Sequence, residues 1–454
     1  MFGQLMASRR FAPMFWCQLL SALNDNFVKN ALVILVLYQA GAAGSAALVT
    51  LASAVLIAPF LLLSALGGEL ADKFDKARVT QALKLAEIPV AAIAAAGFYL
   101  SSVPLLFLAL GLLGVIAALF GPVKYGILPD HLEKRELPAA NALVEGATFF
   151  AILAGTIAGG LAAAGENASL TLSATVLVFA VLCWATAKLI PGTGAAAPDI
   201  QISVNPLYST AALVRQLREQ SRLWIGGLIS SWFWLVGIVA LSLLPTVIKQ
   251  QVGGTPQVVT LGLLTFTVGI ALGSMIAAQA SRSGPNLTLV PVGALIMGLI
   301  SLDLGWIVSS LQPGAEAVSP TDVLASIGGL RLMADLFALA AAGGLFIVPA
   351  FAAVQAWAPV DRRARVVAAV NVLNAALMTA GSLGLSAVQA AGVTSPQVFF
   401  ALGAANLLVL VAVVRVWGKE GLLDAAGFRL GFGRRSQNTG DAAAADQPST
   451  RRTS

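Results

Sequence analysis

The chain has 454 residues, of which 58% are hydrophobic and 11% charged, and its formal net charge is +6. Soluble domains are about 45–50% apolar and about 25% charged, so the composition excludes an ordinary soluble protein. The only two cysteines, Cys17 and Cys183, lie in apolar stretches and exclude a disulfide framework. The single histidine, His131, excludes any metal or catalytic site that needs two. The composition predicts a polytopic membrane protein.

A transmembrane helix needs about 20 predominantly apolar residues, and the chain contains twelve such stretches. They cover 12–40, 45–70, 79–101, 103–128, 138–164 and 169–190, then 222–248, 256–280, 287–311, 330–357, 365–390 and 396–417. The expected fold class is therefore an all-α polytopic membrane protein with 12 transmembrane helices in two six-helix halves. The first stretch carries Asp25 and Lys29 and lacks a small-residue cleavage site, so it is expected to remain as a helix rather than act as a signal peptide.

The chain divides into an N-terminal bundle (1–190), a linker (191–221), a C-terminal bundle (222–417) and a polar tail (418–454) that is expected to be disordered. The charged end of the linker favours one amphipathic helix at the membrane surface. Lysine and arginine gather in alternate turns, at Arg9 and Arg10, Lys73 to Arg78, Lys134 and Arg135, Arg215 to Arg222, Arg282, Arg362 to Arg365 and the tail. The positive-inside rule then places both termini and the linker in the cytoplasm. Topology accounts for the positive charge, and no nucleic-acid partner is expected.

Six helices, a linker and six more helices are typical of a duplicated transporter, with the substrate near the midplane between the halves. The turn after the second stretch reads Gly68-Glu69-Leu70-Ala71-Asp72-Lys73-Phe74-Asp75-Lys76-Ala77-Arg78. It resembles the G-x-L-a-D-(R/K)-x-G-(R/K) signature of the major facilitator superfamily, although Asp75 replaces the second glycine. The resemblance implies a gate formed by Gly68, Asp72, Lys73, Lys76 and Arg78, with Asp72 at a helix N-terminus. An ordinary solvated charged turn is the alternative.

Ionisable groups within a membrane span are costly, so each is a candidate functional group. The first stretch carries Asn24, Asp25, Asn26 and Lys29; Asp25 and Lys29 are four residues apart and could neutralise each other as a structural pair. Lys124 and Glu145 lie at similar depths and could pair across a short turn, or Lys124 could snorkel to the interface. Lys84 and Glu87, three residues apart, are expected to be a structural pair.

The seventh stretch contains Trp232 and Trp234 about ten residues into the span, which favours a cavity wall or a cation–π platform as much as an interfacial belt. Asn371 and Asn374 are polar at intermediate depth and could face the same cavity. Two Gly-xxx-Gly pairs, Gly155 with Gly159 and Gly269 with Gly273, predict close helix packing.

Several stretches together are similar to the bacterial lysophospholipid transporter (LplT) family of the major facilitator superfamily. They are residues 18–32, 120–129 with 141–145, 231–237, and 348–374, and the resemblance extends over about residues 11–417. The resemblance implies a transporter that moves lysophospholipids, chiefly lyso-phosphatidylethanolamine, to the cytoplasmic leaflet of the bacterial inner membrane. Reacylation is then the task of an acyltransferase/acyl-carrier-protein synthetase, expected here as a separate chain because no His-x4-Asp motif occurs.

For such a cargo, Lys29 or Lys124 would bind the phosphate, and Asp25, Glu145, Trp232 or Trp234 the ammonium group. Asn26, Asn371 and Asn374 complete the predicted substrate-binding set. No cofactor or metal is expected, and the sequence leaves open whether H+ or Na+ is coupled. One alternative is a transporter of other amphipathic molecules. A lipid-modifying enzyme is disfavoured because the sequence has no paired histidines, no GxSxG motif and no metal-ligand cluster.

Overall fold

Long apolar segments fold as helices in lipid because each backbone polar group must bond within its own segment. The computed structural model describes residues 2–39, 42–164, 167–202, 205–312 and 317–419. Within these ranges, twelve helices have 20 or more residues, and six fall on either side of the linker. This confirms the predicted fold class. Most of the polar tail, from residue 420 on, lies outside the described residues.

The first six long helices are α2 (Ala12–Gln39), α3 (Ala42–Lys73), α4 (Lys76–Tyr99), α5 (Val103–Gly126), α7 (Leu137–Ala164) and α8 (Ala168–Ala187). The second six are α10 (Ser221–Val247), α11 (Pro256–Ala280), α12 (Leu289–Ser310), α14 (Ile327–Trp357), α15 (Arg363–Ala390) and α16 (Ser395–Lys419). Short elements join them: α1 (Phe2–Met6), α6 (Leu128–His131), α9 (Pro206–Glu219), a π-helix (Ile248–Val252), α13 (Pro320–Ala325) and a 3₁₀ turn (Val360–Arg362). Within the described residues, eleven of the long helices are apolar enough to cross a membrane; α2, with its polar middle, is outside that set.

The two Gly-xxx-Gly pairs allow helices to approach closely, as predicted. A Cβ atom added to Gly155 of α7 would lie 2.7 Å from the Leu23 carbonyl oxygen of α2, and one on Gly159 would lie 2.6 Å from that of Phe27. Gly269 and Gly273 of α11 lie equally close to the backbone of α14. Only glycine fits at such crossings, so these pairs fix how helices pack within each half.

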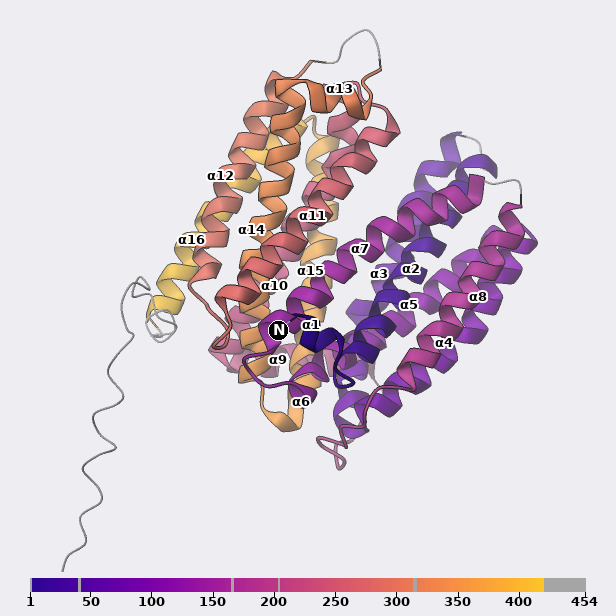
Figure 1. Cartoon of the computed structure of the whole chain (residues 1–454), viewed down its shortest axis with the longest axis vertical. Helices are drawn as coiled ribbons and strands as arrows, with labels where there is room; N and C mark the ends of the chain where they lie inside the picture. Colours follow the sequence, from indigo (N-terminus) through magenta and orange to yellow (C-terminus); the bar gives the residue numbers. More distant parts are fainter. Residues whose placement is uncertain (1, 40–41, 165–166, 203–204, 313–316, 420–454) are drawn as a thin grey trace, which may run out of the picture.

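The linker lies across one end of the bundle, which we call the linker end (Figure 1). Its helix α9 buries Ser209, Leu213 and Leu217 on one side and packs on α3 and α15, one helix from each half. This is the amphipathic helix that the sequence predicted. The two halves converge at the linker end and diverge toward the opposite end (Figure 1). Contacts between the halves are made by α3 and α5 with α15, and by α7 with α11 and α14.

Candidate functional site

The middle of α2 presents charged groups that do not form an ion pair with each other. Lys29 Nζ donates a hydrogen bond to Asn26 Oδ1 at 3.3 Å, and Asn26 Nδ2 donates to the Ala22 carbonyl oxygen at 2.8 Å. The Asp25 carboxylate is half-buried and has no hydrogen-bond or ion-pair partner among the described residues. Asp25 and Lys29 therefore do not form the hydrogen-bonded ion pair that their spacing suggested, although each charge acts electrostatically on the other.

Behind this segment, a fully buried ion pair fixes the orientation of α2. Lys84 Nζ lies 2.7 Å from Glu87 Oε2 on α4, and it also donates to Ser21 Oγ of α2 at 2.7 Å. The same ammonium group lies 4.2 Å from the centroid of the Phe120 ring on α5. The expectation that Lys84 and Glu87 form a structural pair is correct, and it holds three helices together. The Lys84 and Glu87 charges also lie within electrostatic range of Asp25.

Lys124 and Glu145 meet through Tyr125 rather than directly. The Tyr125 hydroxyl donates to Glu145 Oε1 at 2.9 Å, and Lys124 Nζ lies 4.6 Å from the centre of the Tyr125 ring. The other carboxylate oxygen of Glu145 is buried without a hydrogen-bond partner. Lys124 also lies within electrostatic range of Asp25 on α2. We call Asp25, Asn26, Lys29, Lys124, Tyr125 and Glu145 the polar cluster. A cation, a free carboxylate and an aromatic ring are the groups that bind a zwitterion.

The two tryptophans of α10 face different surroundings, because residues two apart on a helix point roughly 200° away from each other. The Trp232 indole N–H donates to Asn406 Oδ1 of α16 at 2.8 Å, within the C-terminal half. Trp234 stacks on Phe149 of α7, with ring centroids 6.0 Å apart and planes 11° from parallel. The structure thus brings Trp234, and not Trp232, to the contact between the halves.

The predicted amides of α15 are also divided between two positions. Asn374 accepts a hydrogen bond from Ser231 Oγ of α10 at 2.8 Å. Asn371 lies against Gly121 of α5, where an added Cβ would come within 2.9 Å of its amide nitrogen. Asn371 therefore faces the N-terminal half, close along α5 to Lys124, and Asn374 is held within the C-terminal half.

Sequence reasoning missed a bridge between the halves next to this cluster. Asn141 Nδ2 of α7 donates to Gln355 Oε1 of α14 at 2.6 Å, and Gln355 Nε2 donates to the Tyr125 carbonyl oxygen at 3.2 Å. The Tyr125 ring also contacts Phe351 of α14 edge-on. Because Tyr125 binds Glu145 as well, the same residue belongs to the polar cluster and to the contact between the halves.

At the linker end, Asp72 joins the two halves. Its carboxylate accepts hydrogen bonds from the Ala364 and Arg365 backbone N–H groups, at 3.1 and 3.2 Å, and from Arg365 Nε at 3.0 Å. Those N–H groups belong to the first turn of α15, where a helix leaves its donors unpaired and favours a negative charge. Gly68, one turn earlier on α3, lets α15 approach, since an added Cβ would lie 2.7 Å from that of Ala368. Asp72 is fully buried, unlike a carboxylate of a solvated turn.

A second carboxylate, Asp130 of α6, completes this contact; it was not among the residues that the sequence predicted for the gate. It pairs with Lys76 of α4 at 2.9 Å and with Arg363 of α15 at 3.0 Å. We call Asp72, Lys76, Asp130, Arg363 and Arg365 the linker-end lock. Two other predicted gate residues, Lys73 and Arg78, make no hydrogen bond or ion pair with α15 within the described part of the chain.

Asp75, which replaces a glycine of the signature, has a different role. It caps α4 by accepting from the Arg78 N–H at 3.1 Å, and it accepts from the Thr193 and Gly194 N–H groups of the linker at 2.9 and 2.7 Å. Partial burial opposes ionisation of this carboxyl, yet these backbone donors together hold its pKa below the usual value. The aspartate fits because its φ is −60°, a conformation that does not need glycine.

The comparison with known families decides which class of protein this geometry belongs to. The family model described as Major Facilitator Superfamily matches residues 14–320. The chain belongs to the major facilitator superfamily. It is therefore a multi-pass membrane transporter, which agrees with the two six-helix halves and the contact of Asp72 with α15.

Solved transporters of this superfamily share the fold at low sequence identity. The human organic anion transporter MFSD10 (TETRAN) aligns with a TM-score of 0.68 and 17% identity, over 89% of this chain and 99% of that protein. The Escherichia coli fucose:proton symporter FucP aligns with a TM-score of 0.64 and 13% identity, over 89% and 97% of the two chains. These likenesses show the fold alone.

Two relatives with higher identity carry the same name. A lysophospholipid transporter LplT of Serratia proteamaculans (strain 568) is 29% identical over 296 residues, covering 64% of this chain and 71% of the relative. LplT of Pectobacterium carotovorum subsp. carotovorum (strain PC1) is 28% identical over 357 residues, covering 77% and 79%. The resemblance to the LplT branch of the superfamily is confirmed.

Proposed function

We propose that this major facilitator transporter moves lysophospholipids, such as lyso-phosphatidylethanolamine, across the bacterial inner membrane to its cytoplasmic leaflet. Two observations together support the proposal. Relatives of this chain are named lysophospholipid transporters, and the Asp25 carboxylate has no ion-pair partner among the described residues and lies within electrostatic range of Lys29 and Lys124. A lysophospholipid has a phosphate, which suits Lys29 and Lys124, and an ammonium group, which suits Asp25, Glu145 or the face of Trp234. Its single acyl chain can remain against apolar helix faces or in the surrounding lipid.

We propose that transport proceeds by alternating access, with the linker end in the cytoplasm. The orientation is supported by the lysines and arginines, which gather in the turns at that end. The linker-end lock holds the halves together there, which supports a closed cytoplasmic side and entry of cargo from the opposite side. Opening then requires Asp72 to leave the α15 N-terminus and Asp130 to leave Arg363.

A transport assay with purified protein in proteoliposomes tests the cargo. Labelled lyso-phosphatidylethanolamine should cross, and Lys124→Ala should slow its transport about tenfold or more, because a charge-assisted hydrogen bond contributes about 1.5–3 kcal/mol. Lys188→Ala is the matched control, since Lys188 also lies over an aromatic ring, 4.4 Å from Trp184, but at the end of α8. The control should transport at the wild-type rate.

The same assay separates the rival cargo. If lysophospholipid neither crosses nor competes while another amphipathic molecule does, the chain is a transporter of that molecule and the proposal is wrong. Proton and sodium gradients, applied one at a time, identify a coupling ion. Adding a separate acyltransferase/acyl-carrier-protein synthetase should convert the delivered lysolipid to diacyl lipid without changing the initial transport rate.

A further inference from the structure

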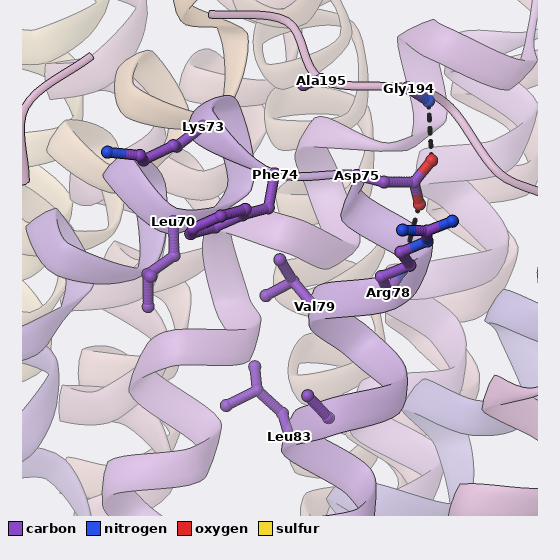
Figure 2. A pocket seen from close by; sticks show the side chains of 10 residues that line it. Leu70, Lys73, Phe74, Asp75, Arg78, Val79, Leu83, Gly194 and Ala195 are labelled. Carbon is purple, nitrogen blue, oxygen red and sulfur yellow. Dashed lines mark hydrogen bonds between the residues drawn. The ribbon is translucent and has the colours of Figure 1, made fainter. Parts of the chain in front are cut away.

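A cavity of about 710 Å³ lies outside the polar cluster, at the linker end of α3 and α4 (Figure 2). Leu70, Val79 and Leu83 form its apolar wall, and Phe74, which also lines it, has 47% of its surface exposed. Both helices reach the end of their membrane-spanning segments here, at 73 and 76. The cavity therefore lies where acyl chains meet headgroups, and its volume is that of a small-molecule site.

Among the residues that the structure describes, the rim of the cavity carries two unpaired positive charges, because its one carboxylate is already hydrogen-bonded to the backbone. Asp75, the carboxylate among the lining residues, is already occupied by backbone N–H groups of Arg78, Thr193 and Gly194. Arg78 is exposed, and its guanidinium has no hydrogen-bond or ion-pair partner within the described part of the chain. Lys73, on the opposite rim in Figure 2, donates only to the Ile200 carbonyl oxygen, at 2.9 Å, and keeps its charge unpaired.

We propose that this cavity binds an anionic phospholipid of the leaflet at the linker end. The Arg78 guanidinium holds the phosphate, an acyl chain lies along Leu70, Val79 and Leu83, and Lys73 adds positive potential from the other rim. A zwitterionic lipid fits less well, because Asp75 has no capacity left for an ammonium group. The site is separate from the polar cluster, and the proposal does not depend on which cargo the protein transports.

Photolabelling tests the proposal on the full chain in mixed detergent–lipid micelles. The probe is phosphatidylglycerol with a diazirine on one acyl chain, and labelled peptides are identified by mass spectrometry. We expect labelling of residues 70–83, with competition by unlabelled phosphatidylglycerol. Phosphatidylcholine should compete much more weakly, and inorganic phosphate and glycerol 3-phosphate should not compete.

Two kinds of variant test the two parts of the site: one removes a cation from the rim, and the other fills the apolar part of the cavity. Arg78→Gln should reduce labelling about tenfold and Lys73→Gln about fivefold, the effect expected of one basic residue near an anionic surface. Arg282→Gln is the matched control, because Arg282 is an exposed arginine in the corresponding turn of the C-terminal half, and it should label like the wild type. Ala82→Trp fills the cavity without removing a cation and should also abolish labelling; size-exclusion profiles report whether each variant is folded.

The outcomes are distinct. Unchanged labelling in a folded Arg78→Gln variant overturns the proposal, and equal competition by phosphatidylcholine reduces the cavity to an apolar groove with no charge selection. Displacement by inorganic phosphate would identify a site for the free anion. None of these results bears on lysophospholipid transport, which is measured separately in proteoliposomes.

Discussion

The two halves share an architecture, but they place different chemistry inside the membrane. The N-terminal half holds a fully buried ion pair, Lys84 with Glu87, and the charged cluster around Asp25. In the C-terminal half, the polar contacts of α10 are neutral, with Asn374 and Asn406 as acceptors, and the described ion pair, Arg331 with Asp303, is 44% and 36% exposed. Burying ions costs several kcal/mol each, and the buried charges of the N-terminal half include the groups to which the proposed function assigns a charged headgroup. In the C-terminal half, α10 supplies neutral hydrogen bonds and aromatic surface, and Asp335 of α14 is a buried carboxylate outside the described ion pair.

The largest expected difference between the halves concerns stability. Lys84→Met leaves Glu87 buried without its partner and should lower the free energy of unfolding by about 3–5 kcal/mol. Lys84→Met with Glu87→Met removes both charges and should regain most of that loss. Arg331→Gln in the C-terminal half should cost under about 1 kcal/mol, as exposed pairs do. Thermal unfolding in detergent measures all three, and equal losses for Lys84→Met and Arg331→Gln would contradict the comparison.

The second largest effect is expected on the opening of the linker end. The linker-end lock joins the two halves there through the charge of Asp72, which belongs to the N-terminal half. Asp72→Asn weakens hydrogen bonds to a charged acceptor, worth about 1.5–3 kcal/mol, and should raise the open fraction at the linker end roughly tenfold or more. Spin labels at the exposed positions Arg135 and Val360 report the separation of the halves. Asp75→Asn makes the same chemical change in the same turn, but without a contact to α15, so it should leave the distance distribution unchanged. A wild-type distribution for Asp72→Asn would show that other contacts close this end.

A smaller difference between the halves is expected in lysophospholipid transport, where the charged Asp25 of the N-terminal half is compared with the neutral amide of Asn374 in the C-terminal half. Asp25→Asn should reduce lysophospholipid transport about tenfold, because it removes the free carboxylate of the cluster. Asn374→Ala should reduce transport only about threefold, since a neutral hydrogen bond contributes about 1 kcal/mol or less. Initial rates in proteoliposomes, normalised to folded protein, measure both. If Asn374→Ala proved the more severe change, headgroup recognition would belong to the C-terminal half.

Local signals in the sequence were sufficient for the fold but only partly for the site. The fold follows from patterns that can be recognised within a single helix. These are the twelve apolar stretches, the Gly-xxx-Gly pairs and the three-residue spacing of Lys84 and Glu87. The partners of Asn141, Asp130 and Arg331 are 214, 233 and 28 residues away, and no local pattern selects them. Arg331 illustrates the point: it precedes Asp335 by four residues on α14, a spacing typical of helical ion pairs, yet it binds Asp303 of α12. Which polar groups meet is decided by tertiary packing.

The depth of the tryptophans was not sufficient to place them, for a related reason. Trp232 and Trp234 lie at the same depth, and depth was the property that favoured a cavity role for both. The direction in which each points depends on the rotation of α10, which is fixed by its neighbours on both sides. Position along the chain could identify the segment, but only the packed structure separates the Trp234–Phe149 contact from the Trp232–Asn406 hydrogen bond.

The smallest expected effect concerns the attachment of the linker to the N-terminal half. Asp75 has a pKa held below the ordinary value of 3.8, so its contribution to stability is complete above that value and is lost as the pH falls through the lower, folded-state pKa. Protease cleavage of the linker near Thr193 and Gly194 should therefore be equally slow from pH 8 to pH 5 and should accelerate only below about pH 4, tested with an acid-active protease. Asp75→Asn should be cleaved faster than the wild type at pH 7 and should lose this pH dependence. Cleavage that accelerated between pH 7 and pH 5 would assign the attachment to another titrating group, because a carboxylate with a lowered pKa is fully ionised throughout that interval.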